Sequence, residues 1–244
     1  MRLISPTDSM FLLTESREHP MHVGGLQLFK PPEGAGPQFV REAYEAMIAI
    51  REVQPTFCKH PAKILGGITN VAWSFDDDID LDYHLRRSAL PSPGRVRELL
   101  QLTSRLHGSL LDRHRPLWEA HLVEGLADGR FAVYVKFHHA LIDGVSALKL
   151  MQRALTADPT NTDTKVPWAL PPRHRDRNSE NQSRLAGFAH LAGSVPALSP
   201  GNVRHWPSRT MVRHPGSRTA MIGMTVLTVL GHSRRMGDST SWRR

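Results

Sequence analysis

The stretch FAVYVKFHHALIDG, residues 131–144, decides the fold prediction, because it contains the end of one element and the start of the next. Residues 131–137 alternate between apolar and mixed side chains, and this two-residue period predicts a half-buried β-strand over Phe131–Phe137. One face of the strand would carry Phe131, Val133, Val135 and Phe137, and the other Ala132, Tyr134, Lys136 and His138.

A helix is predicted directly after this strand, from Gly144 to Leu155. Its apolar residues recur at steps of three and four and form one stripe of Val145, Leu148, Met151 and Leu155. Asp143 stands at the helix N-cap, where its carboxylate can accept hydrogen bonds from free backbone N–H groups. His138 and His139 therefore lie at a strand end beside a turn, where rigid elements fix side chains that the turn exposes.

Two adjacent histidines with Asp143 close behind allow three interpretations. The first is a general base, in which a neutral imidazole accepts a proton from a hydroxyl or thiol, while Asp143 caps the helix and pairs with a distant arginine. The second is a metal site, which needs at least three converging ligands. The chain has one cysteine, Cys58, and no second His/Asp cluster at ligand spacing, so this interpretation is weaker. The third is a histidine pair that only packs and hydrogen-bonds.

A resemblance to a known family rests on these residues and on two flanking motifs. His138-His139-x-x-x-Asp143-Gly144 resembles the HHxxxDG signature of the CoA-dependent acyltransferase superfamily, which includes peptide-synthetase condensation domains and chloramphenicol acetyltransferases. The flanking sequences are similar to those of bacterial wax ester synthase/diacylglycerol acyltransferases. They are Ser5-Pro6-x-Asp8-x-x-Phe11-Leu12, Arg115-Pro116-Leu117-Trp118-Glu119 and Leu141-Ile142-Asp143-Gly144-Val145-Ser146-Ala147. The resemblance covers the N-terminal lobe, from Met1 to about Leu155.

The resemblance implies an acyl-CoA-dependent O-acyltransferase that esterifies diacylglycerol, as in triacylglycerol synthesis, or a long-chain alcohol, giving a wax ester. It implies His139 as the general base, with His138 in a positioning role, Asp143 as structural support and Gly144 as the last residue of the signature. Acyl-CoA would be a co-substrate, and neither a bound cofactor nor a metal is expected. The alternatives are a condensation-type domain that joins carrier-bound substrates, and an inactive half-enzyme or interaction module.

Composition limits the cellular compartments and the partners that we expect for the protein. The single Cys58 excludes a disulfide framework and fits a reducing compartment. The N-terminus lacks the design of a signal peptide, and the longest apolar run, Met221–Leu230, has about half the length of a spanning helix. We therefore expect a cytoplasmic protein, open to peripheral association with a membrane or with lipid bodies, and no nucleic-acid partner.

The basic charge of the chain is concentrated at its C-terminal end. The net charge is +8, and residues 165–244 contain 13 of the 31 Lys and Arg residues but 3 of the 23 Asp and Glu residues. The remaining 18 basic and 20 acidic residues leave the first 164 residues nearly neutral. Such an asymmetry is typical either of a binding tail or of foreign sequence.

The other predicted elements complete an α/β lobe. Helices are expected at Ser5–Leu13, Phe39–Val53 and Arg95–Leu111, and strands at His22–Phe29, Val71–Phe75 and Trp118–Val123. Asp128-Gly129 predicts a hairpin before Phe131, and residues 55–67 are expected to be irregular. The order of elements predicts a two-layer sandwich with a mixed sheet, resembling one lobe of the chloramphenicol acetyltransferase-like fold.

The composition changes along the chain, and these changes predict three segments. Residues 1–158 form the predicted acyltransferase lobe with the HHxxxDG signature, and residues 159–199 form a proline-rich linker that allows a short helix at Leu185–Leu198. Residues 200–244 form an irregular basic tail, disordered or translated out of frame. In the family that the chain resembles, a second lobe with an Asn-Asp motif follows the first, so we expect a truncated protein.

Overall fold

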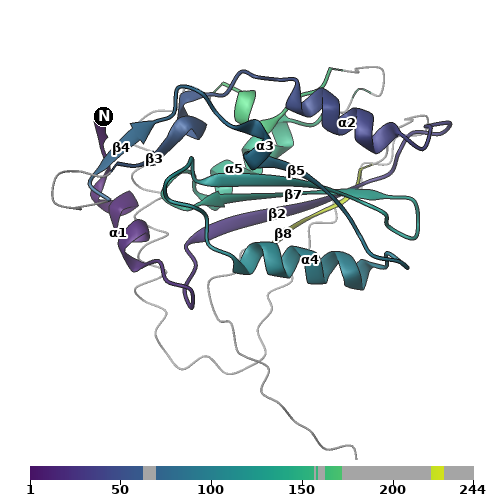
Figure 1. Ribbon diagram of the computed structural model, residues 1–244, viewed down its shortest axis with the longest axis horizontal. Coiled ribbons are helices and arrows are strands. Elements are labelled where there is room, and N and C mark those ends of the chain that lie inside the picture. Colours follow the sequence, from purple (N-terminus) through teal and green to yellow (C-terminus); the bar gives the residue numbers. More distant parts are fainter. Residues whose placement is uncertain (63–69, 157, 159–162, 172–220, 228–244) are drawn as a thin grey trace, which may run out of the picture.

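The strand predicted from FAVYVKF forms β7, Phe131–His138, and lies at the centre of a five-stranded sheet in the computed structural model of the chain. The structure describes residues 1–62, 70–156, 158, 163–171 and 221–227 (Figure 1). The elements are β1 (Arg2–Leu3), α1 (Pro6–Thr14), β2 (His22–Phe29), α2 (Phe39–Ile48), η1 (Pro55–Cys58), β3 (Lys59–Pro61), β4 (Ala72–Phe75), α3 (Leu81–His84), β5 (Leu85–Ala89), α4 (Val96–Gly108), β6 (Trp118–Glu124), β7 (Phe131–His138), α5 (Gly144–Arg153), η3 (Pro167–Ala169) and β8 (Met221–Leu227).

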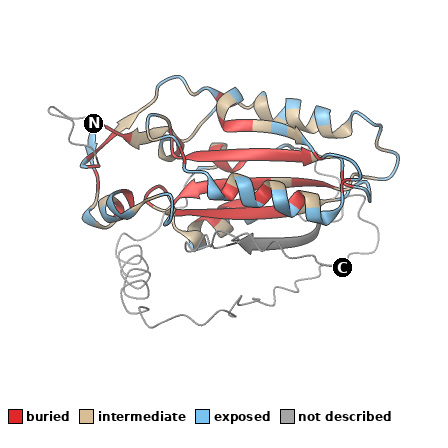
Figure 2. Ribbon diagram, turned by 60° about the horizontal axis from the view of Figure 1, so that its bottom comes forward, coloured by how far each residue is buried: buried red, intermediate tan, exposed pale blue. Residues whose placement is uncertain are grey.

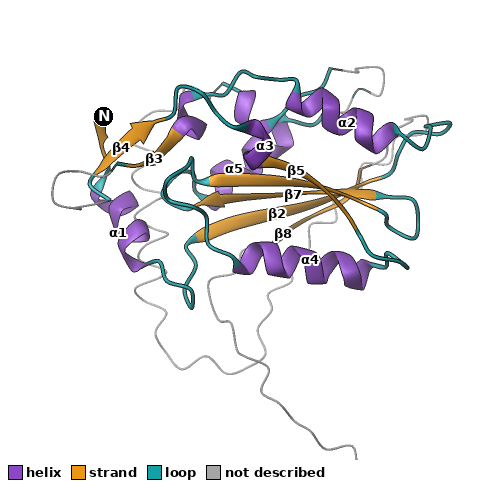
Figure 3. Cartoon of the chain, in the orientation of Figure 1, coloured by secondary structure: helices purple, strands orange, loops and turns teal. Residues whose placement is uncertain are grey.

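The large sheet has the strand order β5-β6-β7-β2-β8, and its neighbouring strands are antiparallel except for the parallel pair β5 and β6. The predicted α/β class with a mixed sheet is confirmed. A second sheet, β1-β4-β3, lies near α1 (Figure 3). Helix α4 packs on one face of the large sheet, whereas α2 and α5 pack on the other, which adds helices on both faces to the expected sandwich (Figure 1).

The hairpin between β6 and β7 turns at Asp128-Gly129, as predicted. Gly129 has a φ of 76°, in the left-handed region that glycine adopts without steric cost. The Asp128 carboxylate accepts a hydrogen bond from the backbone N–H of Arg130 at 3.2 Å. The resulting register places Glu119 of β6 directly opposite Lys136 of β7.

Both faces of β7 are buried, so the prediction of a half-buried strand is wrong (Figure 2). The apolar face was assigned correctly, since Val135 and Phe137 pack with Trp118 in one core cluster. The opposite face was expected to be the more exposed one, but α4 covers it, and Lys136 and His138 are both 0% exposed. One face of β7 is therefore apolar and the other carries polar side chains, but both faces are buried.

Lys136 is held by polar groups of α4 and its C-cap and of β6. Its ammonium group donates to the carbonyl oxygens of Leu106 at 2.7 Å and Ser109 at 2.9 Å, and lies 2.6 Å from Oε1 of Glu119. Burial alone would raise the pKa of Glu119, but His121 and Lys136 outweigh burial and lower it to about 2. The Glu119 carboxylate is therefore charged, whereas burial lowers the pKa of Lys136 and Glu119 opposes that shift.

The same contacts explain where α4 ends. The helix ends at Gly108, earlier than the predicted Leu111, and Lys136 binds carbonyl oxygens at this end, which attracts cations through the helix dipole. Leu110, which the helical period assigns to the inward face, lies beyond this end and is 38% exposed. The prediction for Leu110 is therefore wrong.

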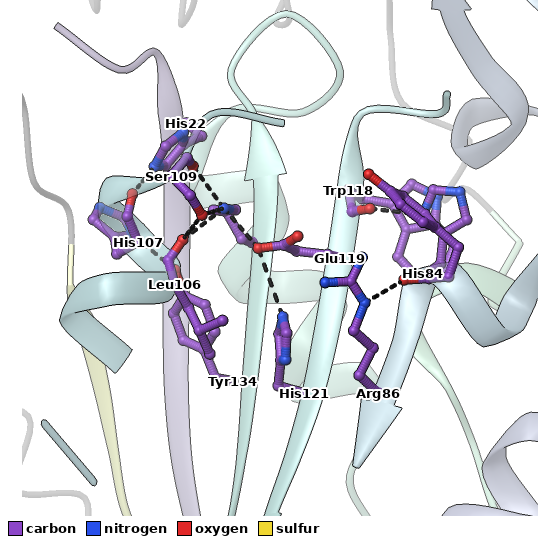
Figure 4. Close-up of polar contacts among 12 residues, drawn as sticks. His22, His84, Arg86, Leu106, His107, Ser109, Trp118, Glu119, His121 and Tyr134 are labelled. Carbon is purple, nitrogen blue, oxygen red and sulfur yellow. Dashed lines mark hydrogen bonds and ion pairs between the residues drawn. The ribbon is translucent and has the colours of Figure 1, made fainter. Parts of the chain in front are cut away.

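Two histidines and a tyrosine continue this polar layer between α4 and the sheet (Figure 4). A His22 ring nitrogen contacts the carbonyl oxygen of His107, and His107 Nδ1 lies 2.8 Å from the Tyr134 hydroxyl. Burial, with the charge of Lys136, lowers the pKa of both histidines to about 4, so both are neutral near pH 7. Gly24 is required here, because a Cβ at this position would lie 2.9 Å from both His107 Nδ1 and the Tyr134 hydroxyl.

The other helices depart from their predictions in length or in orientation. Helix α2 ends at Ile48 and not at the predicted Val53. Beyond the helix, the N–H of Gln54 donates to the carbonyl oxygen of Trp168 at 2.8 Å. In α5 the buried side chains are Ala147, Leu150 and Met151. Val145 is 58% exposed, so the predicted apolar stripe is wrong at its first member.

Several elements carry too weak a sequence signal to have been predicted. The segment expected to be irregular forms η1 and β3 over residues 55–61, and the edge strand β5 contains two arginines. Within the tail, Met221–Leu227 forms β8 and pairs with β2, so the expectation of an irregular tail is wrong for these residues. The proposed helix at Leu185–Leu198 lies outside the described residues. No helix in the described part of the chain is long and apolar enough to cross a membrane.

Replacement of Lys136 tests the buried ion pair. Lys136→Met leaves the Glu119 carboxylate buried without its partner, and we expect the free energy of unfolding to fall by about 3–5 kcal/mol in urea titrations. The double variant Lys136→Met/Glu119→Gln removes the unpaired charge and should recover part of this loss. Lys149→Met, on an exposed position of α5, is the control and should change stability by less than about 0.5 kcal/mol. Equal stability of Lys136→Met and the control would contradict the pairing.

Candidate active site

The two histidines of the HHxxxDG signature stand where β7 ends, and backbone hydrogen bonds hold them from both sides. The N–H of His138 donates to the carbonyl oxygen of Leu117 at 2.9 Å, next to β6. The N–H of His139 donates to the carbonyl oxygen of Met21 at 2.8 Å, next to β2. The end of β7 is therefore fixed between its two neighbouring strands, up to the last histidine.

His138 also closes the turn that follows. Its ring atom Nδ1 accepts a hydrogen bond from the N–H of Ala140 at 3.0 Å. Its carbonyl oxygen accepts from the N–H groups of Leu141 at 2.9 Å and Ile142 at 3.2 Å. All backbone N–H groups from His138 to Ile142 thus have an acceptor, which leaves the turn little freedom to rearrange.

The other ring nitrogen of His138 faces a buried carboxylate. Nε2 lies 3.3 Å from Oε1 of Glu15, and the two side chains are 0% and 1% exposed. Glu15 also accepts from Arg113 at 3.0 Å and from the N–H of Met21 at 3.2 Å. Burial would raise the pKa of Glu15, but His138, Arg113 and Met21 together lower it to about 2, so the carboxylate is charged.

His139 has different surroundings. Its side chain is half-buried, whereas that of His138 is enclosed. Its ring stacks on Phe11 of α1, with a distance of 4.2 Å between ring centroids and an angle of 24° between the planes. Of the two histidines, His139 is therefore the one that combines a fixed ring with access from outside.

Asp143 occupies the N-cap of α5, as predicted. Its Oδ1 accepts from the backbone N–H of Ser146 at 2.9 Å, and its Oδ2 accepts from the Ser146 hydroxyl at 2.7 Å. Both carboxylate oxygens thus bind the first turn of the helix. Asp143 connects the histidine turn to α5.

Gly144 is the first residue of α5 and borders an apolar pocket between β2 and α5. The pocket is small, with a volume of about 10 Å³, and its walls include Val23, Gly25, Gly144 and Met151. A Cβ on Gly144 would lie 3.8 Å from Val23, an ordinary contact distance. The space around Gly144 in this structure therefore does not by itself demand glycine.

The contacts of α1 with the signature are the main feature that the sequence did not reveal. Phe11 lies in a motif that the resemblance uses, but no partner for it was predicted, and no role was predicted for Glu15. Their spacing of four residues is the available signal, because it places both on one side of a helix. Among the described residues, no group of three or more His, Cys, Asp or Glu side chains is arranged to hold a metal ion.

The strand–turn–helix with two fixed histidines is the arrangement that the HHxxxDG signature predicts for a CoA-dependent acyltransferase. Residues 4–237 match the wax ester synthase/diacylglycerol acyltransferase catalytic domain family. The chain therefore belongs to this family. The resemblance described from the motifs ends at about Leu155. The family match extends further and includes most of residues 159–244.

Relatives of known name support this assignment. The probable diacylglycerol O-acyltransferase tgs2 of Mycobacterium tuberculosis is 65% identical over 205 residues, which cover 84% of this chain and 45% of that protein. A second putative diacylglycerol O-acyltransferase of the same organism is 55% identical over 201 residues. The structure of wax ester synthase/diacylglycerol acyltransferase from Marinobacter aquaeolei VT8 is similar, with 40% identity and a TM-score of 0.66, over 81% of this chain and 48% of that one. The chain spans about half the length of these relatives.

Substitution of Asp143 tests the cap. We expect Asp143→Ala to lower the free energy of unfolding by about 0.5–2 kcal/mol, because the first turn of α5 loses both acceptors. Asp143→Asn should lose less, since asparagine caps helices nearly as well. The measurement is urea unfolding followed by circular dichroism, with the exposed Asp78→Ala as the control. If Asp143→Ala unfolds at the same urea concentration as the control, Asp143 does not stabilise α5.

Proposed function

We propose that the chain transfers an acyl group from acyl-CoA to the hydroxyl of diacylglycerol or a long-chain alcohol, with His139 as the general base. The observation that carries the proposal is the contrast between the two histidines. Both nitrogens of the His138 ring face protein groups, Ala140 and Glu15, and its side chain has no exposed surface. His139 is held by its backbone and by Phe11, and it is half-buried, with its ring atom Nδ1 enclosed.

The chemistry requires one proton acceptor and no covalent intermediate with the protein. The imidazole of His139 accepts the hydroxyl proton as the alcohol oxygen attacks the thioester carbonyl carbon. A C–O bond forms and the C–S bond of the thioester breaks, so that the acyl group moves to the alcohol. The CoA thiolate then takes the proton from His139, and the base returns to its neutral state.

The remaining residues of the signature support this base. His138 would position the turn through its ring and its carbonyl oxygen, and Asp143 would hold the start of α5 against the same turn. Gly144 would keep one wall of the apolar pocket free of a side chain. No bound cofactor is needed, since acyl-CoA supplies the activated acyl group.

The substrates also suggest where the protein works. Diacylglycerol and long-chain alcohols reside in lipid, so we propose a cytoplasmic protein that associates with a membrane or a lipid body from outside. Exposed leucines near the N-terminus are consistent with this, since Leu3 is 82% exposed and Leu13 on α1 is 63% exposed. A contact of this kind would bring the acceptor hydroxyl to the protein without a spanning helix.

Replacement of His139 tests the proposed base. We expect His139→Ala to lower kcat by roughly 10²–10⁴-fold, the usual contribution of general-base catalysis. His138→Ala should lower kcat less and stability more, because its ring closes the turn. The rate is measured as CoA released from acyl-CoA in the presence of diacylglycerol, and the exposed His114→Ala is the control. A wild-type chain that releases no CoA, or equal rates for wild type and His139→Ala, would contradict the proposal.

A further inference from the structure

Helix α1 contacts both histidines of the signature through two residues of its own. Phe11 stacks on the ring of His139, and Glu15, at the C-cap of the helix, lies 3.3 Å from Nε2 of His138. Phe11 and Glu15 are four residues apart, so they lie on the same side of a helix, one turn apart. One face of α1 therefore contacts two consecutive residues of the turn.

Helix α1 is itself fixed by contacts that do not involve the histidines. Ser5 caps its N-terminus, where the Ser5 hydroxyl accepts from the N–H of Asp8 at 3.1 Å. The Ser9 hydroxyl donates to the carbonyl oxygen of Asn70 at 2.6 Å. At the other end, Arg113 donates to the carbonyl oxygen of Leu12 at 2.6 Å. The helix can therefore act as a rigid support.

The hydrogen bond that Nδ1 of His138 accepts determines which ring nitrogen can carry a single proton. A backbone N–H can only donate, so the contact with Ala140 requires a lone pair on Nδ1 of His138. A ring with a single proton then carries it on Nε2, the nitrogen that faces Glu15. A charged carboxylate at that position favours a ring N–H directed toward it.

We propose that Phe11 and Glu15 are positioning residues for the base, with Phe11 holding the ring plane of His139 and Glu15 holding the ring of His138 in the Nε2–H form. The inference rests on the proposed function, because it assigns these residues to the same site. A general base must lie within hydrogen-bond reach of the proton that it accepts, and a rotation of the ring would end that alignment. Neither residue needs to touch the substrate.

The experiment combines NMR of the histidine rings with kinetics on the full chain. In the wild type we expect contacts between the ring protons of Phe11 and His139, and nitrogen shifts of the Nε2–H form for His138. Phe11→Leu should shift the His139 ring protons downfield, because the ring current of Phe11 is lost. Its kcat should fall by on the order of 10²-fold, with a KM for acyl-CoA that changes by less than about twofold. Thr14→Ser, at an exposed position of α1, is the matched control and should change neither.

The second variant addresses the carboxylate. Glu15→Gln keeps the size of the side chain and removes its charge, so the Nε2 signal of His138 should move. Glu18→Gln removes the same charge at an exposed position and should leave that signal in place. If Glu15→Gln gives a His138 spectrum equal to that of Glu18→Gln, Glu15 does not hold the ring.

Other outcomes also decide between the two proposals. A wild-type spectrum without the Phe11–His139 contact, or with His138 in the Nδ1–H form, would overturn the inference even if every variant failed to fold. A raised KM with unchanged kcat in Phe11→Leu would also overturn it, because Phe11 would then be a substrate contact. The expected spectra in a chain that releases no CoA would support the orientation of the rings and refute the proposed function.

Discussion

The ion pair between Lys136 and Glu119 is the constraint on which the sheet and the site both depend. A lysine with no exposed surface needs polar partners, and here they are the Glu119 carboxylate on β6 and two carbonyl oxygens at the end of α4. A shift of β7 by one residue would move Lys136 to the opposite face, into the apolar cluster of Trp118, Val135 and Phe137. The pair therefore favours the register that places His138 and His139 at the end of the strand.

From that register, the site is assembled by contacts between distant parts of the chain. Strands β2 and β6 hold the backbone of the two histidines, α5 follows through the cap at Asp143, and α1 covers the rings. The arrangement leaves His138 enclosed and His139 accessible. This difference between two adjacent and chemically identical residues is the basis of the proposal that His139 is the base and that His138 has a structural role.

The sequence predicted the local parts of this account and missed the distant ones. The hairpin at Asp128-Gly129, strand β7 and the cap at Asp143 depend on neighbouring residues, so their signals lie within a few positions. The burial of Lys136 was missed, because a lysine in an alternating strand predicts a solvent-exposed position. The strand pattern does not indicate that α4 covers this face. The support by Phe11 and Glu15 crosses more than 120 residues of sequence, and no local pattern reports such a contact. Strand β5 was missed because it is an edge strand with two arginines.

Native-state hydrogen exchange of the His139 and Ala140 amides tests most directly whether the turn is held as the structure shows. Their acceptors are the Met21 carbonyl oxygen and the ring of His138, so both amides depend on the contacts that fix the site. The account predicts that they exchange as slowly as the amides of the β6–β7 hairpin, because they open only with the sheet. Exchange as fast as that of the exposed residue Asp77 would contradict it, since the histidines would then stand on a mobile loop.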